Sequence, residues 1–348
     1  MPRSIPRSVL ILALLVAAIA VGCEDETTNV EPGVTEPPAL LTPRFWYPAS
    51  PPLSMDNSTA LPAANAVRAY WYQIEPEWGA TTRDFNPETS TENDVPVTTM
   101  HIEVDLIPDD PARWTGIMTG FPGSWDGHRG TGGVPGGLDP LDLSKSDVMK
   151  IWVNDFKPNP GDRGGKIYIE LGFIDEDFYR PDLNEHNLED ADRNGFTVGG
   201  EHNEDTGLDG ILTGQPGDDP NDDYISQRMD DNRFTHINGT EGNGRADDED
   251  LDGNEQLDLL DAYFRYEVDL GAKAVRDVRR DYPTFSEFKH PLDSWRLYEI
   301  RLEDYDAVTP TGRVPYRDQI KHMPIWFDDI GAVVNPQVKC TQMREIEF

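Results

Sequence analysis

The chain has 348 residues and a formal net charge of −35, with 65 acidic side chains against 30 basic ones. This charge would repel a duplex or an anionic lipid surface, so we expect no nucleic-acid partner and regard cations as the natural counter-partners. Only 37% of the residues are hydrophobic, but eight Trp, 12 Tyr and 13 Phe can fill a core. Fully disordered chains are usually poorer in aromatic residues, so we expect a folded domain.

Residues 1–22 have the features of a lipoprotein signal peptide. A basic start precedes an apolar run over 9–21, which is short for a membrane-spanning helix. Small residues then lead into Cys23, as at a bacterial lipoprotein cleavage site, although Ala20 replaces the usual Leu. We therefore predict that Cys23 carries a lipid anchor. A plain secretory signal with an incidental Cys is the alternative.

Residues 23–63 are predicted to form the lipid anchor and a proline-rich tether, because seven prolines fall within 24–52. The acidic trio 24–26 resembles a surface-export signal of some bacterial lipoproteins. We expect an outer-membrane location, facing either the cell surface or the periplasm, with order beginning near Ala64 and one domain over 64–348.

Period-two alternation of apolar and polar residues predicts strands in the rest of the chain. The predicted segments are 98–107, 113–121, 146–156, 164–174, 263–270, 294–304 and 322–330. In the fourth of these, Ile167, Ile169 and Leu171 fall on one face, and polar residues fall mostly on the other. The pattern indicates a mainly β protein, an antiparallel β-sandwich of jelly-roll type.

Residues 175–261 interrupt this pattern with 27 Asp and Glu, five Arg and no Lys. Composition alone favours disorder, whereas the spacing of the carboxylates favours cross-linking by cations. The stretch "DADRNGFTVGGE" matches the EF-hand loop pattern at Asp190, Asp192, Asn194 and Glu201, although glycines replace the start of an exiting helix.

A second stretch, "DLDGNEQLDLLD", places oxygen-bearing side chains at the positions of a calcium loop. These residues are Asp250, Asp252, Asn254, Gln256, Asp258 and Asp261. Glu255 stands where the loop normally has Gly, and Asp261 is shorter than the usual bidentate Glu. Because calcium takes six to eight oxygen ligands, we predict structural Ca²⁺ in an acidic insertion. A chance match in an acid-rich chain is the alternative.

Several landmarks in order resemble the repeated soluble modules of the SprA family of cell-surface gliding-motility and type IX secretion proteins. They are "WYQIEP" (71–76), "WTGIM" (114–118), "MKIWVNDF" (149–156), "IYIELGFIDED" (167–177), "EDTGLDG" (204–210), "DDPNDDY" (218–224), "INGTEGN" (237–243) and "AYFRYEVDL" (262–270). The resemblance implies an ordered acidic segment. Proteins of that family are several times longer and include a membrane barrel, so we expect one detached, tethered module rather than a secretion channel.

No motif for a nucleophile elbow, a zinc protease or a phosphate loop is present, and we predict a non-catalytic protein. His186, His202 and His236 could bind a transition metal but are better read as solvated loop residues. If Cys23 is lipidated, Cys340 cannot form an internal disulfide. Because no His lies near Cys340 in the sequence, we expect Cys340 to be a buried or idle thiol.

Two functions remain open. The first is protein–protein interaction or structural support in an outer-membrane, gliding or secretion-like assembly, with an envelope protein as partner. The alternative is a carbohydrate-binding cell-surface lipoprotein with a glycan as partner. The candidate exposed rings for a sugar are Trp46, Tyr47, Trp71, Tyr72, Trp78 and Trp125, for which core or loop packing is the simpler interpretation.

Overall fold

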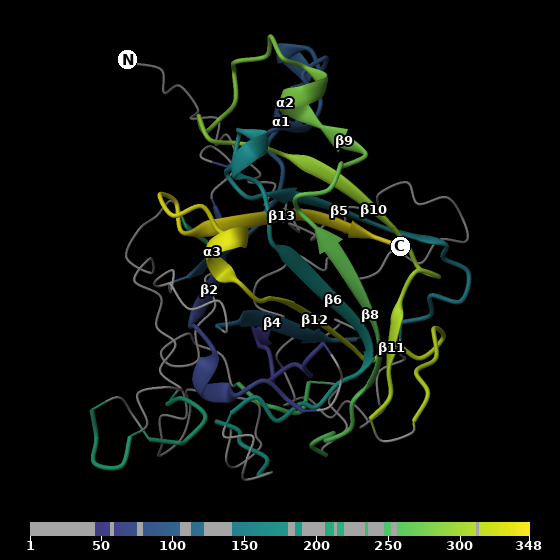
Figure 1. Cartoon of the computed structure of the whole chain (residues 1–348). Helices are drawn as coiled ribbons and strands as arrows, with labels where there is room; N and C mark the ends of the chain where they lie inside the picture. Colours follow the sequence, from purple (N-terminus) through teal and green to yellow (C-terminus); the bar gives the residue numbers. More distant parts are fainter. Residues whose placement is uncertain are drawn as a thin grey trace, which may run out of the picture. The chain divides into compact units, whose positions relative to one another are not determined.

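Two antiparallel sheets pack face to face in the computed structural model (Figure 1). The structure describes residues 46–55, 59–74, 79–104, 113–121, 141–179, 185–189, 206–211, 214–218, 234–235, 247–251, 256–310 and 313–348. All of these residues belong to one compact unit.

The first sheet has six strands and the second has seven. The first runs in the order β1 (Tyr47–Pro48), β4 (Thr115–Gly120), β12 (His322–Phe327), β6 (Lys166–Phe173), β8 (Ala262–Asp269) and β11 (Asp306–Val308). The second runs in the order β7 (Phe234–Thr235), β2 (Ala69–Ile74), β3 (Met100–Val104), β13 (Cys340–Glu347), β5 (Val148–Asn154), β10 (Arg296–Arg301) and β9 (Arg276–Asp277).

Helices are short in the described part of the chain. They are α1 (Thr82–Phe85), α2 (Val278–Asp281) and α3 (Ile330–Val333), with 3₁₀ turns η2 (Ala63–Asn65), η3 (Thr91–Asn93) and η4 (Pro160–Asp162). No helix among the described residues is long and apolar enough to cross a membrane.

The central strands have jelly-roll order. Strands β4, β12, β6 and β8 are neighbours in one sheet, and β3, β13, β5 and β10 are neighbours in the other. Counting these eight strands along the chain, each connection crosses to the opposite sheet except the one from β6 to β8. That arrangement is the double Greek key of a jelly roll, so the predicted fold class is confirmed. The acidic segment 175–261 is the connection between β6 and β8.

Alternating apolar residues build the core between the sheets. Met149, Ile151 and Val153 of β5 are fully buried there, and β6 contributes the predicted Ile167 and Ile169. All seven predicted strand segments contain an observed strand. Because successive side chains of a strand point to opposite sheet faces, the register of these strands also decides what lies on the two outer faces.

The predicted tether extends too far along the chain. Residues 46–55 belong to the sandwich: Trp46 is fully buried, and Trp71 Nε1 donates to its carbonyl oxygen at 3.2 Å. Tyr47 and Pro48 form β1, the edge strand that pairs with β4. An edge strand tolerates proline because one side of its backbone needs no hydrogen bonds, which is why the proline count misled the prediction.

This N-terminal segment covers the outer face of the six-stranded sheet. Arg265 of β8 donates to Glu170 of β6 at 2.7 Å and to the carbonyl oxygen of Leu53 at 2.7 Å. Trp326 Nε1 donates to the same Glu170 oxygen at 2.9 Å. On the predicted polar face of β6, Glu170 is therefore buried beneath residues 46–55, whereas Lys166 at the start of the strand stays partly exposed. The Arg265–Glu170 pair joins the cover to the sheet.

The outer face of the seven-stranded sheet has a different cover. The buried cluster on it consists of Ala80, Phe85, Trp152, Val278 and Trp295, contributed in part by α1 and α2. In Figure 1 these two helices lie together beyond β5, β10 and β13. The cover extends over only part of the sheet, and the cavity described next lies beside it.

Candidate functional site

A row of four side chains crosses the outer face of the seven-stranded sheet. The register places His101 of β3 between Tyr72 of β2 and Gln342 of β13. It places Asn154 of β5 on the other side of Gln342. Directly opposed residues share a face, with Cβ atoms about 5 Å apart, so these side chains are neighbours. The Tyr72 and His101 rings stack with centroids 5.3 Å apart.

Hydrogen bonds fix the orientation of both amides in this row. Asn154 Oδ1 accepts from the backbone N–H of Phe156 at 3.0 Å. Asn154 Nδ2 donates to Gln342 Oε1 and to Asp293 Oδ1, both at 2.8 Å. Gln342 Nε2 is therefore turned toward the imidazole of His101, 2.7 Å from Nε2. These hydrogen bonds therefore hold the polar groups of the row in fixed orientations.

Lys289, His290 and Asp293 form the opposite wall, from the segment between α2 and β10. The backbone N–H of Lys289 donates to Asp84 at 3.2 Å, and that of His290 donates to Asp293 at 2.8 Å. Burial raises the pKa of Asp293 to about 7, and burial also lowers the pKa of His290. Both shifts favour the uncharged form, so this wall suits hydrogen bonds with a neutral polar ligand.

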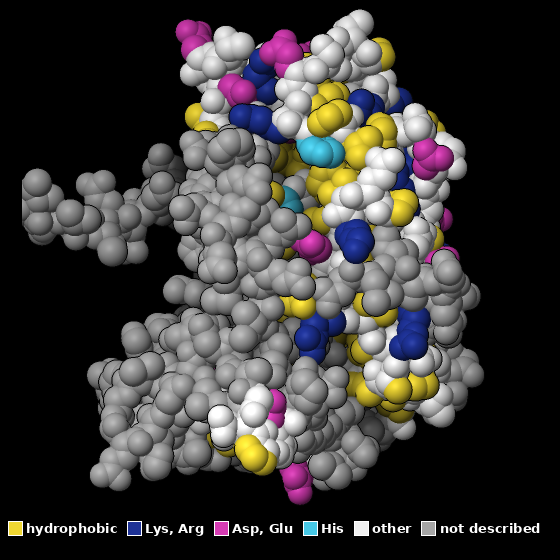
Figure 2. All heavy atoms as spheres, turned by 90° about the vertical axis from the view of Figure 1, so that its left-hand side faces the viewer, with side chains coloured by type: hydrophobic (Ala, Val, Ile, Leu, Met, Phe, Trp, Pro, Cys, Tyr) yellow, Lys and Arg dark blue, Asp and Glu magenta, His cyan; other side chains and the backbone are white. Residues whose placement is uncertain are grey.

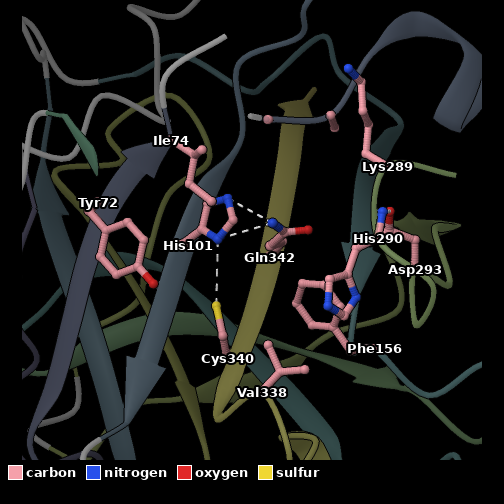
Figure 3. A pocket seen from close by; sticks show the side chains of 12 residues that line it. Tyr72, Ile74, His101, Phe156, Lys289, His290, Asp293, Val338, Cys340 and Gln342 are labelled. Atoms are coloured by element: carbon pink, nitrogen blue, oxygen red, sulfur yellow. Dashed lines mark hydrogen bonds between the residues drawn. The ribbon is translucent and has the colours of Figure 1, made fainter. Parts of the chain in front are cut away.

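The two walls enclose a cavity of about 240 Å³ (Figure 3). Its apolar lining includes Ile74, Val338 and Phe156, whose ring meets the His290 ring edge-on at 5.5 Å. Figure 2 shows His side chains among hydrophobic ones on one face of the molecule, with Lys and Arg side chains nearby. A ligand in the cavity would meet apolar surface and oriented polar groups together.

The acidic insertion is cross-linked by its own carboxylates. Three buried glutamates, Glu176, Glu189 and Glu249, each accept hydrogen bonds from several backbone N–H groups. The donors lie 2.7–3.1 Å from the carboxylate oxygens. They are Leu251 and Asp258 for Glu176, Thr206, Gly207 and Asp247 for Glu189, and Tyr179 and Asn187 for Glu249. Burial raises the pKa of Glu249 to about 7. Such charge-assisted bonds hold together the described parts of the acidic loop.

The predicted calcium ligands are only partly covered by the structure. The ligands that lie outside the described residues are Asp190, Asp192, Asn194, Glu201, Asp252 and Asn254. The predicted lipid attachment site, Cys23, also lies outside them. Of the remaining four, Asp258 lies 3.6 Å from Lys321 Nζ, and Asp261 Oδ1 accepts from the backbone N–H of Asp175 at 3.2 Å. The described residues contain no group of three or more His, Cys, Asp or Glu placed to hold a metal. The calcium site therefore stays a prediction.

Other sequence candidates have clear positions. The rings of Trp46, Tyr47, Trp71 and Tyr72 are at most 6% exposed, in line with core packing, and Trp78 and Trp125 lie outside the described residues. His186 is 2.6 Å from Asp248 and partly buried, so it is not the solvated loop residue that we expected. Its contact with Asp248, 62 positions further along the chain, could not be read from its neighbours in sequence.

Sequence reasoning missed the residues of the cavity. Cys340 is buried as predicted, but the fold brings His101 to 3.7 Å from its Sγ across 239 sequence positions (Figure 3). The alternation of segment 98–107 does place His101 on the polar face of its strand. This alternation does not tell which strand pairs with the segment, so the sequence could not show that Gln342 and Asn154 lie in the same row as His101.

No family model matches the chain, and no curated protein matches it. Among solved structures it is similar to a family 11 carbohydrate-binding module from Clostridium thermocellum, determined in complex with a beta-1,3-1,4-mixed-linked tetrasaccharide. The identity is 6%, the match covers 80% of this chain and 94% of that chain, and the TM-score is 0.26. A TM-score this low carries no argument about a shared ligand.

Proposed function

We propose that the protein is a non-catalytic binding module whose cavity on the seven-stranded sheet holds a neutral, polar organic ligand, with a sugar unit as the best fit. The observation that carries this proposal is the oriented row of Tyr72, His101, Gln342 and Asn154 beside a cavity of about 240 Å³. This volume suits a small ligand or one residue of a longer chain.

A sugar matches the chemistry of this lining. Its ring carries C–H groups that can pack on Phe156 and Ile74, and its hydroxyl groups both donate and accept hydrogen bonds. The cavity offers both partners, since Gln342 supplies an amide and Asp293 supplies a carboxyl group whose raised pKa lets it carry a proton. His290 and Asp293 favour their neutral forms, so a charged ligand would gain less from these two groups.

The test is calorimetric titration of the purified protein with oligosaccharides selected from a glycan array. His290→Ala removes a side chain of the opposite wall and should weaken binding about tenfold or more, a loss of about 1.4 kcal/mol. Lys166→Ala, on exposed β6 surface, is the matched control and should bind like wild type. Absence of any selective glycan, or equal binding by the His290 variant, would contradict the proposal.

A second candidate is docking of an envelope protein, as the SprA resemblance implies. The observation that favours it is the edge of the six-stranded sheet, where β11 is the last strand. Tyr305, Val314 and Tyr316 flank this strand and are 40%, 56% and 54% exposed. An edge strand beside exposed apolar side chains suits a partner that adds a strand. Crosslinking in intact cells should trap a partner, and Tyr316→Asp should reduce the crosslink.

We also propose that the protein is held at the outer membrane by a lipid on Cys23. The support is the sequence alone: an apolar leader, small residues and then Cys23. Two or more acyl chains give stable anchoring, whereas one gives marginal binding. Cys23→Ser should therefore release the protein from the membrane fraction or stall its processing. A Ser variant that sediments with membranes and is processed like wild type would contradict the anchor.

A further inference from the structure

Three residues other than glycine have a left-handed backbone conformation in the part of the chain that the structure describes. They are Phe156 (φ 55°), Asp329 (φ 38°) and Lys339 (φ 57°). This conformation is uncommon for a side chain as bulky as Phe, and it persists only where the surrounding structure enforces it. Because strained residues of this kind gather at binding sites and active sites, their positions are a guide to the site that is independent of the cavity.

All three residues lie in two segments that are bonded to each other. One segment follows the end of β5, and the other contains α3 and the turn that leads into β13. Lys157 Nζ donates to the carbonyl oxygen of Ala332, and Asn335 Nδ2 donates to that of Phe156 at 2.6 Å. The same two segments supply Phe156 and Val338 to the lining of the cavity. The strained conformations are therefore concentrated beside the cavity.

Asn335 organises the turn between α3 and β13. It is 9% exposed and is not among the side chains that line the cavity. Its backbone oxygen accepts from the N–H of Lys339 at 2.7 Å, and its Oδ1 accepts from the N–H of Gln337 at 2.8 Å. Because Oδ1 is occupied by a backbone donor, the amide has one orientation, and Nδ2 must face the carbonyl oxygen of Phe156.

Two amide side chains hold the backbone of Phe156 from both sides. Its N–H donates to Asn154 Oδ1 at 3.0 Å, and its carbonyl oxygen accepts from Asn335. These bonds fix the left-handed conformation, which keeps the Phe156 ring edge-on to the His290 ring, with centroids 5.5 Å apart (Figure 3). Without the Asn335 bond, the residue can relax toward an ordinary conformation, and the ring would move.

We propose that Asn335 is a positioning residue of the binding site, which holds Phe156 and Val338 so that the apolar side of the cavity is formed before a ligand arrives. This inference rests on the proposed function, because it gives Asn335 a role in ligand binding. A preformed surface spares the ligand the cost of ordering it. Asn335 therefore contributes to affinity through the two lining residues and not through a contact of its own.

Asn335→Asp tests the bond, because it keeps the shape and the acceptor oxygen but removes the N–H donor. The readout is the NMR signal of the His290 ring protons, in the full chain without ligand at pH 8. Burial lowers the pKa of His290, so the ring is uncharged there. The signal should move in the same direction as in Phe156→Leu and by at least half as much. An unchanged signal would overturn the proposal.

Asn159→Asp is the matched control, because it makes the same substitution at an exposed residue whose amide donates to Asp162. It should leave the His290 signal in place. A general loss of stability would not move this signal in a folded variant, whereas a displaced Phe156 ring would.

Calorimetry with the oligosaccharide that the glycan array selects for wild type measures the effect on binding. Asn335→Asp should weaken binding about tenfold, and Asn159→Asp should bind like wild type. A shifted His290 signal with wild-type affinity would overturn the positioning role. A wild type that binds no oligosaccharide would contradict the proposed function, whereas the His290 signal needs no ligand and tests the hold of Asn335 on Phe156 separately.

If Asn335→Asp does not fold, the side-chain amide of Asn335 in wild type decides. Its N–H₂ protons should exchange with water at least about tenfold more slowly than those of the exposed Asn159, because one of them is bonded to the carbonyl oxygen of Phe156. Equal exchange rates would overturn the proposal.

Discussion

The two outer faces of the sandwich use buried polar side chains in opposite ways. On the six-stranded sheet, Glu170 and Arg265 meet each other and the backbone of residues 46–55, so that the polar groups close the face. On the seven-stranded sheet, Gln342 and His101 bond to neighbours in their own sheet and border a cavity. The comparison teaches that a polar row borders a cavity where the covering segment stops short of it.

The largest effect should come from opening the closed face. Arg265→Met leaves the Glu170 carboxylate buried without its charged partner, and breaking such a pair costs about 3–5 kcal/mol. The free energy of unfolding, measured in urea, should fall by that amount. The matched control Lys166→Met breaks the exposed pair with Glu267 and should cost less than about 1 kcal/mol. Similar losses in both variants would show that the Arg265 contacts do not lock the cover.

The next prediction concerns calcium binding by the acidic insertion that connects β6 to β8. If the two predicted loops bind Ca²⁺, free calcium about 100-fold above Kd should stabilise the fold by roughly 2.7 kcal/mol per site. Chelation should lower the melting temperature, and Asp252→Ala should remove one site of two in a calorimetric titration. No heat of binding together with an unchanged melting temperature would show that the chain's own carboxylates suffice to order the segment.

Those carboxylates can be tested directly. Glu189→Gln replaces an acceptor of three backbone N–H groups and turns an amide N–H₂ toward at least one of them. We expect a loss of about 2 kcal/mol, confined to the insertion. Limited proteolysis should then cut within 175–261 faster than in wild type, while cleavage in the sandwich strands is unchanged. Uniformly faster cleavage would mean that the insertion is not a separate unit of stability.

The cavity face should respond to pH. The folded pKa of Asp293 is about 7, above the ordinary value near 3.9, because the charged form is buried. Its stabilising contribution is full below about pH 4 and is lost as the pH rises through about 7. Wild type should therefore lose about 2–3 kcal/mol more than Asp293→Asn between pH 5 and 8. If thermal unfolding shows the same pH dependence of stability in wild type and in Asp293→Asn, then Asp293 does not cause that dependence.

The alternation of apolar and polar residues predicted the strands of the core but not which strands pair with one another. Strands β5, β6 and β8 repeat apolar residues with period two, and the structure confirms them. Strand β13 was missed because a bulge between Arg344 and Ile346 breaks this period. The site was missed because His101 and Gln342 become neighbours only through strand pairing across most of the chain. The local sequence pattern determines toward which face of the sheet a side chain points, and the register of strand pairing determines which side chains it contacts.

The place of β13 has a consequence for how the molecule is made. This strand lies near the C-terminal end of the sequence, yet it fills the middle of the seven-stranded sheet, between β3 and β5. While the earlier strands are being synthesised, β3 and β5 have no partner between them, and the sheet cannot close. Folding must therefore wait for nearly the whole domain, and many contacts link distant positions, which makes folding slow.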